Sequence, residues 1–368
     1  MSDTTATQTP PMGALLARWL PRAEALLIPL AALLCGLAVF SLFLLTLGKS
    51  PIDFYALIYK AGFSTAFSWQ NTLSRVAPLL FAGLCVALPA RLGLVVIGGE
   101  GAIVLGGLAA AVLGLAVVGA PPVIGFVVMA AGAALMGGLW IGAVGWLRFK
   151  RGVNETIASL LMAYIAIALM NHLVEGLFRD PQSLNKPSTA PLPEALRVGD
   201  MPIGIDVHWG FAFGVLACVI SWVLMDRTTI GFAARIAGDN VRAAQVQGLP
   251  VGKLIIGFTA LGGACAGLAG FFEVSAIHGS ANGSLISGYG YTGILVAFLA
   301  RHNPLAIIPV ATLLAGFEAS SGLIQRRMDL PDATILVMEG IVFVVLLLSE
   351  TLYGRLAIFN PTFWEKKA

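Results

Sequence analysis

A carboxylate within an apolar stretch is the first residue in this sequence with evident chemical potential. Glu100 stands between Gly99 and Gly101, with Gly98 before them, inside an apolar run over residues 93–118. Burying a carboxylate in lipid costs a few kcal/mol, so Glu100 must face a polar cavity, a partner or interrupted backbone. The glycines permit such an interruption, and half-helix N-termini can hold polar groups in mid-membrane. We therefore predict that Gly98, Gly99 and Glu100 line a solute pathway; the alternative is a hydrogen bond that only fixes packing.

Further polar and aromatic side chains extend the predicted pathway. Asn154 and Glu155 begin an apolar run directly after the basic segment Arg148–Arg151. They could form a gate, or Glu155 could be a solvated charge at a helix N-terminus. Tyr164, Asn171 and Tyr289 could stack on, or hydrogen-bond to, a base or a sugar. Anchoring at the membrane interface is the alternative role for the tyrosines.

A short capped helix is predicted in the basic connection over residues 226–253. Asp239 is a suitable N-cap, residues 240–247 form the helical body, Gly248 ends it, and Pro250 blocks its continuation. Gly248 is expected to adopt a positive φ to turn the chain back. Such a helix, about 12 Å long, is suited to contact a motor protein, and an ordinary amphipathic surface loop is the alternative.

Other kinds of chemistry lack the necessary residue patterns. The four histidines have no metal-ligand spacing, and the four cysteines sit in apolar runs without a CxxC pair. The string Gly48-Lys49-Ser50 has Phe43 where a phosphate-binding loop needs glycine, and Pro51 follows it. We therefore expect neither an enzyme nor a cofactor. The net charge of +3 gives no reason to expect a nucleic-acid partner.

Composition indicates the elements that position these residues. Hydrophobic residues make up 58% of the chain and charged residues 11%, whereas soluble domains average about 25% charged residues. The apolar residues form runs of about 20, the length that a bilayer-spanning helix requires. The sequence therefore predicts an all-α, polytopic transmembrane helical bundle. Its ten predicted spans cover residues 25–47, 71–90, 93–118, 121–147, 153–177, 209–226, 253–278, 284–300, 304–321 and 333–353.

The distribution of lysine and arginine predicts an orientation for this bundle. With a cytoplasmic N-terminal tail over residues 1–24, ten spans over 25–353 return the tail 354–368 to the cytoplasm. Inside segments then hold 14 of the 22 basic residues and outside segments hold 8, the expected bias. By the same parity the loop 178–208 is external, and both Arg148–Arg151 and the connection 226–253 are cytoplasmic.

Four segments in register resemble known transport proteins. The connection 226–253 resembles the coupling-helix loop of permease subunits of ABC importers, through Thr228-Thr229-x-Gly231, Arg235-x-x-Gly238-x-Asn240, Ala243-Ala244 and Gly248. Three more segments resemble the nucleoside-importer branch of the ribose and branched-chain amino acid permease superfamily. They are Ile97-Gly98-Gly99-Glu100-Gly101, residues 152–166, and residues 288–297 with Asn303-Pro304-Leu305. Val96 departs from the pattern, because that branch has asparagine there.

The resemblance implies a permease subunit of an ABC importer in the bacterial cytoplasmic (inner) membrane. It would form an alternating-access pathway for a small polar solute, a nucleoside or a related purine, pyrimidine or sugar compound. The implied partners are a cytoplasmic ATP-binding subunit, a second, paralogous permease and an extracytoplasmic solute-binding protein. The implied coupling residues are Arg235, Gly238, Asp239, Asn240, Ala243, Ala244 and Gly248. The alternative is a secondary transporter whose coupling carboxylate is Glu100 or Glu273.

Overall fold

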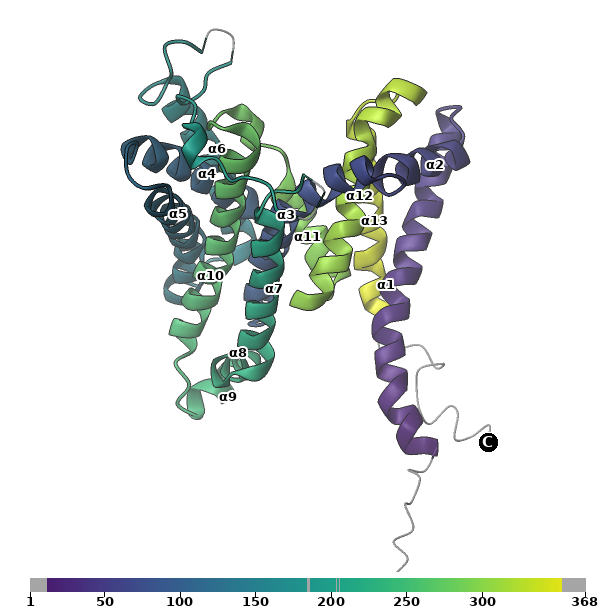
Figure 1. Ribbon diagram of the computed structural model, residues 1–368. Coiled ribbons are helices and arrows are strands. Elements are labelled where there is room, and N and C mark those ends of the chain that lie inside the picture. Colours follow the sequence, from purple (N-terminus) through teal and green to yellow (C-terminus); the bar gives the residue numbers. More distant parts are fainter. Residues whose placement is uncertain (1–11, 184–185, 203, 205, 353–368) are drawn as a thin grey trace, which may run out of the picture. The chain divides into compact units, whose positions relative to one another are not determined.

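The computed structural model describes residues 12–183, 186–202, 204 and 206–352, and most of these residues are helical (Figure 1). The chain divides into two compact units. The smaller unit combines Met1–Phe54 with Met328–Ala368, and the larger unit is Tyr55–Arg327.

The smaller unit is built on two helices, α1 (Met12–Thr46) and α13 (Ala333–Ser349), which is followed by the 3₁₀ turn η4 (Glu350–Leu352). Gly36 lies directly against Val342, so the two helix backbones approach closely. The Lys49 ammonium donates a hydrogen bond of 2.6 Å to the Met328 carbonyl. Helix α1 begins at Met12, within the predicted N-terminal tail, whereas residues 1–11 and 353–368 of the two tails lie outside the described residues.

The larger unit holds most of the helices. Helix α2 (Pro51–Gly62) crosses the boundary between the units. The long helices are α3 (Ala66–Ala90), α4 (Gly99–Ala116), α5 (Pro122–Arg151), α6 (Glu155–Glu175), α7 (Gly210–Arg227), α10 (Val251–Phe272) and α12 (Pro304–Met328). The shorter elements are η1 (Glu194–Leu196), α8 (Thr229–Asp239), α9 (Val241–Val246), the π-helical turn η2 (Glu273–His278), η3 (Gly283–Leu285) and α11 (Tyr289–Leu299).

The helices confirm the all-α membrane class. Within the described residues, nine helices are long and apolar enough to cross a membrane, and they coincide with nine of the ten predicted spans. The remaining prediction, residues 284–300, is wrong as a full-length helix. Helix α11 has 11 residues and rises about 16 Å, roughly half the hydrocarbon thickness of a bilayer. The glycines and serines before Tyr289 interrupt the helical pattern there.

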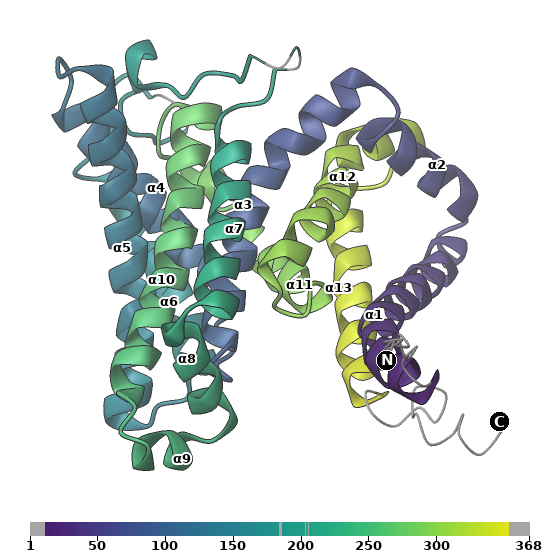
Figure 2. The ribbon, with the colours of Figure 1, turned by 60° about the horizontal axis from the view of Figure 1, so that its bottom comes forward.

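Small residues allow the central helices of the larger unit to pack closely. A Cβ atom at Gly137 would overlap the backbone at Gly263 and Gly267, and one at Gly267 would overlap the backbone at Ala133. Helices α5 and α10 therefore touch backbone to backbone, as small residues permit in lipid. Figures 1 and 2 show α5, α7 and α10 side by side, with α8 and α9 at one end and η1 at the other.

Candidate pathway and coupling site

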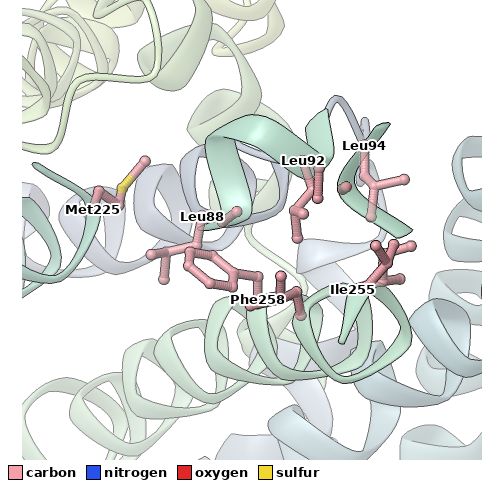
Figure 3. Close-up of a cluster of buried hydrophobic side chains, with 11 residues drawn as sticks. Leu88, Leu92, Leu94, Met225, Ile255 and Phe258 are labelled. Carbon is pink, nitrogen blue, oxygen red and sulfur yellow. The ribbon is translucent and has the colours of Figure 1, made fainter. Parts of the chain in front are cut away.

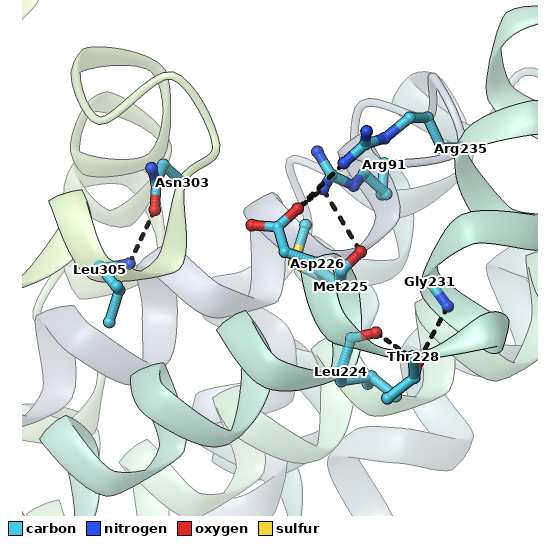
Figure 4. A network of polar contacts seen from close by, with 9 residues as sticks. All are labelled: Arg91, Leu224, Met225, Asp226, Thr228, Gly231, Arg235, Asn303 and Leu305. Atoms are coloured by element: carbon cyan, nitrogen blue, oxygen red, sulfur yellow. Dashed lines mark hydrogen bonds and ion pairs between the residues drawn. The ribbon is translucent and has the colours of Figure 1, made fainter. Parts of the chain in front are cut away.

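The connection between α7 and α10 folds into two short helices. Thr228 caps the first of them, α8: its hydroxyl oxygen accepts a hydrogen bond of 3.2 Å from the Gly231 N–H and donates one of 2.6 Å to the Leu224 carbonyl (Figure 4). The threonine hydroxyl thus satisfies a free N–H group at the start of one helix and a carbonyl near the end of another. This side chain fixes the sharp turn from α7 into α8.

An ionic cluster ties this connection to the end of α3. The Asp226 carboxylate accepts hydrogen bonds from the guanidinium groups of Arg91 and Arg235, the latter at 3.0 Å (Figure 4). Arg91 also donates to the Met225 carbonyl at 3.4 Å. Arg235, a predicted coupling residue, therefore has a contact within its own chain. The sequence did not predict the pairing of Arg91 with Asp226, because residue spacing does not reveal a pair 135 residues apart.

Helix α9 coincides with the predicted short helix, but its cap is different. Helix α8 continues to Asp239, so Asp239 ends one helix and does not begin the next. Asn240 has the extended backbone of an N-cap, and its side-chain oxygen accepts a hydrogen bond of 3.0 Å from the Ala243 N–H. The prediction of Asp239 as the cap is wrong by one residue. Gly248 has φ +76°, which confirms the predicted left-handed turn.

Helix α9 buries one face and exposes the other. Ala244 is fully buried in a hydrophobic cluster with residues of α3, α7, α8 and α10, among them Leu88 and Ile255, and with Leu92 just after α3 (Figure 3). Gly238 packs directly on the backbone of Arg91 and Leu92, where a Cβ atom would overlap. Ala244 and Gly238 therefore anchor the connection to the bundle. The outer face of α9 consists of Val241, Arg242, Ala243, Gln245 and Val246, and Val246 is 89% exposed.

Glu100 joins the beginnings of two helices. Its carboxylate is fully buried, and its Oε1 and Oε2 accept hydrogen bonds of 2.8 and 2.7 Å from the backbone N–H groups of Gly288 and Gly290. Those N–H groups lie at the start of α11, and Glu100 itself lies in the first turn of α4. A negative charge is favourable at both positions, because each helix N-terminus carries partial positive charge.

The segment before α4 is non-helical and is held by α6. The Ile97 N–H donates a hydrogen bond of 3.0 Å to the Ser159 hydroxyl oxygen, and the Thr156 hydroxyl donates one of 2.9 Å to the Val95 carbonyl. Gly98 fits against the Ser159 carbonyl with no room for a side chain. Irregular backbone is tolerated in a membrane protein where such partners satisfy its polar groups. Thr156 and Ser159 were missed from the sequence because hydroxyl residues are common in membrane helices.

The remaining predicted pathway residues separate into two groups. Tyr289 is buried beside the Gly288 and Gly290 contacts with Glu100. Asn154 and Glu155 lie instead at the turn between α5 and α6. Asn154 caps α6 by accepting a hydrogen bond from the Ile157 N–H at 3.1 Å, and Glu155 pairs with Arg148 at 3.2 Å. Along α6, Tyr164 is exposed and Asn171 is half-buried. Their proposed contact with a solute stays a prediction.

The fold and these contacts define a multi-pass helical membrane protein with a short helix, α9, between two spans, buried on one face and exposed on the other. The family described as "Branched-chain amino acid transport system / permease component" matches residues 68–348, and the chain belongs to it. The chain is therefore a permease component of an ABC transporter, a transport subunit and not an enzyme. Family membership therefore favours the ABC permease over the other candidate function, an ion-coupled secondary transporter.

Named relatives are similar over most of their length. The chain is 31% identical over 331 residues to the glucose ABC transporter permease protein TsgB13 of Haloferax volcanii, covering 88% of this chain and 87% of the relative. It is 30% identical to the guanosine ABC transporter permease protein NupP of Bacillus subtilis, over 87% of this chain and 92% of the relative. It is 22% identical to the nucleoside permease NupB of Lactococcus lactis, over 87% and 90%.

Proposed function

We propose that this permease imports a neutral, hydroxyl-rich solute, a nucleoside or a related sugar compound, and takes its energy from a separate ATPase bound at α9. The named substrates of its relatives include glucose and guanosine. These two compounds share several sugar hydroxyl groups and carry no charge at neutral pH. A pathway for either one needs hydrogen-bonding groups more than an ion-pairing site.

The exposed face of α9 is the observation that carries the coupling part of the proposal. Asn240 caps this helix and the buried side chain of Ala244 anchors it, so α9 has a defined position on the bundle. Its other face presents Val241 and Val246 outside the long apolar helices. A rigidly held helix with exposed apolar side chains is suited to insertion into a groove on a partner protein.

The basic residues support the proposed orientation. Arg148, Lys150 and Arg151 end α5, and the positive-inside bias places them in the cytoplasm. The connection carrying α8 and α9 then faces the cytoplasm, where the ATP-binding subunit is found. The loop 178–208 faces the opposite side, where a solute-binding protein delivers the solute. A second, paralogous permease completes the pathway in the bacterial inner membrane.

Replacing Val246 by Arg tests the coupling site. We expect the variant to insert normally, to lose co-purification of the ATPase and to lose solute-stimulated ATP hydrolysis in liposomes, because a charge would replace an apolar contact. Leu177→Arg is the matched control, since Leu177 is 78% exposed in the turn just after α6 and lies outside the connection between α7 and α10. Ala244→Arg would not serve, because it would disrupt the buried cluster. Retention of both ATPase signals by Val246→Arg would contradict the proposal.

A further inference from the structure

Four elements of the larger unit bring polar side chains together around Tyr289. Arg75 of α3 hydrogen-bonds the buried Tyr289 side chain at the start of α11. One turn later on α11, Thr292 hydrogen-bonds Glu318 of α12. Glu273, at the end of α10, interacts electrostatically with both Tyr289 and Glu318. These residues form what we name the Tyr289 cluster: Arg75, Glu273, Tyr289, Thr292 and Glu318.

Two buried polar atoms of this cluster lack a hydrogen-bond partner. The Glu273 side chain is 3% exposed; its Oε2 lies 3.3 Å from His278 Nε2, whereas its Oε1 has no partner. Arg75 Nε is likewise buried and unpartnered. An unsatisfied buried polar group is destabilising, so native proteins keep few without a functional reason. A solute with several hydroxyl groups would satisfy an acceptor and a donor of this kind.

The backbone at Glu273 is also unusual. Glu273–His278 forms the π-helical turn η2, which ends at Gly279 with φ +69°. Such turns occur frequently at functional sites, because the widened backbone redirects side chains. The Glu273 carboxylate at the start of this turn is buried and interacts electrostatically with Tyr289 of α11 and Glu318 of α12.

The loop 178–208 lies against the same end of α10. The Val198 N–H donates to the Ser275 carbonyl at 3.0 Å, the Leu192 N–H to the Gly279 carbonyl at 2.7 Å, and the Thr189 N–H to the Ala281 carbonyl at 2.9 Å. This loop is the connection that parity places outside the cell. The Tyr289 cluster therefore lies in the half of the bundle that faces the delivered solute.

The charges of the cluster define which solutes it accepts. Glu273 and Glu318 contribute two carboxylates and Arg75 one guanidinium. The nearby Glu100 carboxylate is occupied by the backbone N–H groups of Gly288 and Gly290. Carboxylates accept hydrogen bonds from hydroxyl groups, and Arg75 with Tyr289 donates them. A phosphate group would meet the carboxyl groups of Glu273 and Glu318, whereas Arg75, the guanidinium of the cluster, already bonds to Tyr289, and this arrangement disfavours an anion.

We infer that the Tyr289 cluster binds the hydroxyl groups of a neutral solute during its passage and rejects the phosphorylated form of the same solute. This inference rests on the proposed function and names the site at which that function selects its substrate. It predicts selection by the permease itself, independent of the solute-binding protein.

Equilibrium binding to the full-length chain in lipid nanodiscs tests the inference without any partner. Saturation-transfer NMR with guanosine, glucose and their monophosphates reports weak binding directly. We expect the wild type to bind guanosine or glucose and to exclude the corresponding phosphate ester. Tyr289→Phe and Glu318→Gln should each weaken binding of the neutral solute about tenfold, the size expected for one hydrogen bond to a charged group. Glu318→Gln should also admit the phosphate ester.

Two control variants remove a hydroxyl group outside the Tyr289 cluster. Tyr59→Phe removes an exposed tyrosine hydroxyl from α2. Thr312→Val changes α12 at a hydroxyl that bonds only to the Ile308 carbonyl of its own helix. The inference is overturned if the wild type binds neither neutral solute, if phosphate esters bind equally well, or if both cluster variants bind like the controls. ATPase association at α9 is measured separately, so these outcomes contradict the inference without touching the coupling proposal.

Discussion

The carboxylate of Glu100 accepts a hydrogen bond of 2.7 Å from the backbone N–H of Gly290, a residue 190 positions further along the chain. A Cβ atom at Gly290 would overlap the Glu100 backbone, so the contact requires glycine. The carboxylate thus fixes where α11 begins relative to α4. Glu100 has a structural role whether or not a solute also passes it.

Glu100→Gln should destabilise this junction. An amide side chain offers one acceptor oxygen, so one of the two N–H groups at the start of α11 would lose its partner. We expect the free energy of unfolding to fall by about 1–3 kcal/mol, measured as thermal unfolding of the purified protein. Glu194→Gln on the exposed turn η1 is the control. An unchanged melting temperature would show that the two hydrogen bonds contribute nothing to stability.

Asn240→Ala should loosen α9, whereas Asp239→Ala should not. Asn240 provides the N-cap acceptor for the Ala243 N–H, and loss of such a cap costs about 1 kcal/mol. Asp239 ends α8 and is exposed. Hydrogen exchange at the Ala243 amide should accelerate about fivefold in the first variant, because 1 kcal/mol corresponds to that factor. Equal exchange in the two variants would contradict the assigned cap.

Local sequence signals predicted the short-range features well. Gly248 at the end of α9 and the apolar runs of nine helices act within a few residues, so their positions emerged from the sequence. The cap was misplaced by one residue because Asp239 and Asn240 are both good capping residues. The extended backbone of Asn240 decides between them, and that backbone depends on how far α8 continues.

The sequence did not predict the long-range pairings between residues. Arg91 with Asp226, Arg75 with Tyr289 and Glu100 with Gly290 each join positions more than 100 residues apart. Nothing in the spacing of a single sequence specifies such pairs. Helix α3 begins at Ala66, before the predicted span 71–90, and carries Arg75 within it, but the span alone did not indicate Tyr289 as the partner of Arg75.

Cysteine labelling of intact cells should establish the orientation. In a background with Cys35 replaced by alanine, we expect an impermeant thiol reagent to label Gln182→Cys and to spare Lys150→Cys. Gln182 is exposed in the predicted external loop and Lys150 is exposed in the last turn of α5. Gln182 is preferable to Ser188, which forms a bridge with Asn282. The reverse labelling pattern would show the opposite topology, with α9 outside the cell.

Acid should destabilise the protein through His208, just before α7. Burial lowers the pKa of His208, although Ser74, Glu273 and Asp200 favour its charged form. The neutral ring accepts a hydrogen bond from the Gly210 N–H at 3.1 Å on Nδ1 and contacts the Ser74 carbonyl at 3.2 Å through Nε2. The unfolded chain therefore takes up the proton first as pH falls through about 6.5. The stability that the neutral His208 ring contributes to the folded state is present above that pH and is lost below it.

His208→Asn isolates this contribution, because asparagine retains an acceptor for Gly210 but does not titrate. We expect the melting temperature of the wild type to fall more between pH 7.5 and 5.5 than that of the variant. Equal pH dependence in the two proteins would show that other groups govern acid stability.

The anchoring of α8 and α9 has a mechanical consequence. Arg91 at the end of α3 is tied to Asp226, and Leu92 and Ala244 share one buried cluster. A displacement of α9 by a partner would therefore be passed to the end of α3 that carries Arg91. Arg75 lies about 24 Å away along the same helix. Pro78 and Pro89 lie between these two residues, and each removes a backbone hydrogen bond, so α3 would bend there more easily than a regular helix.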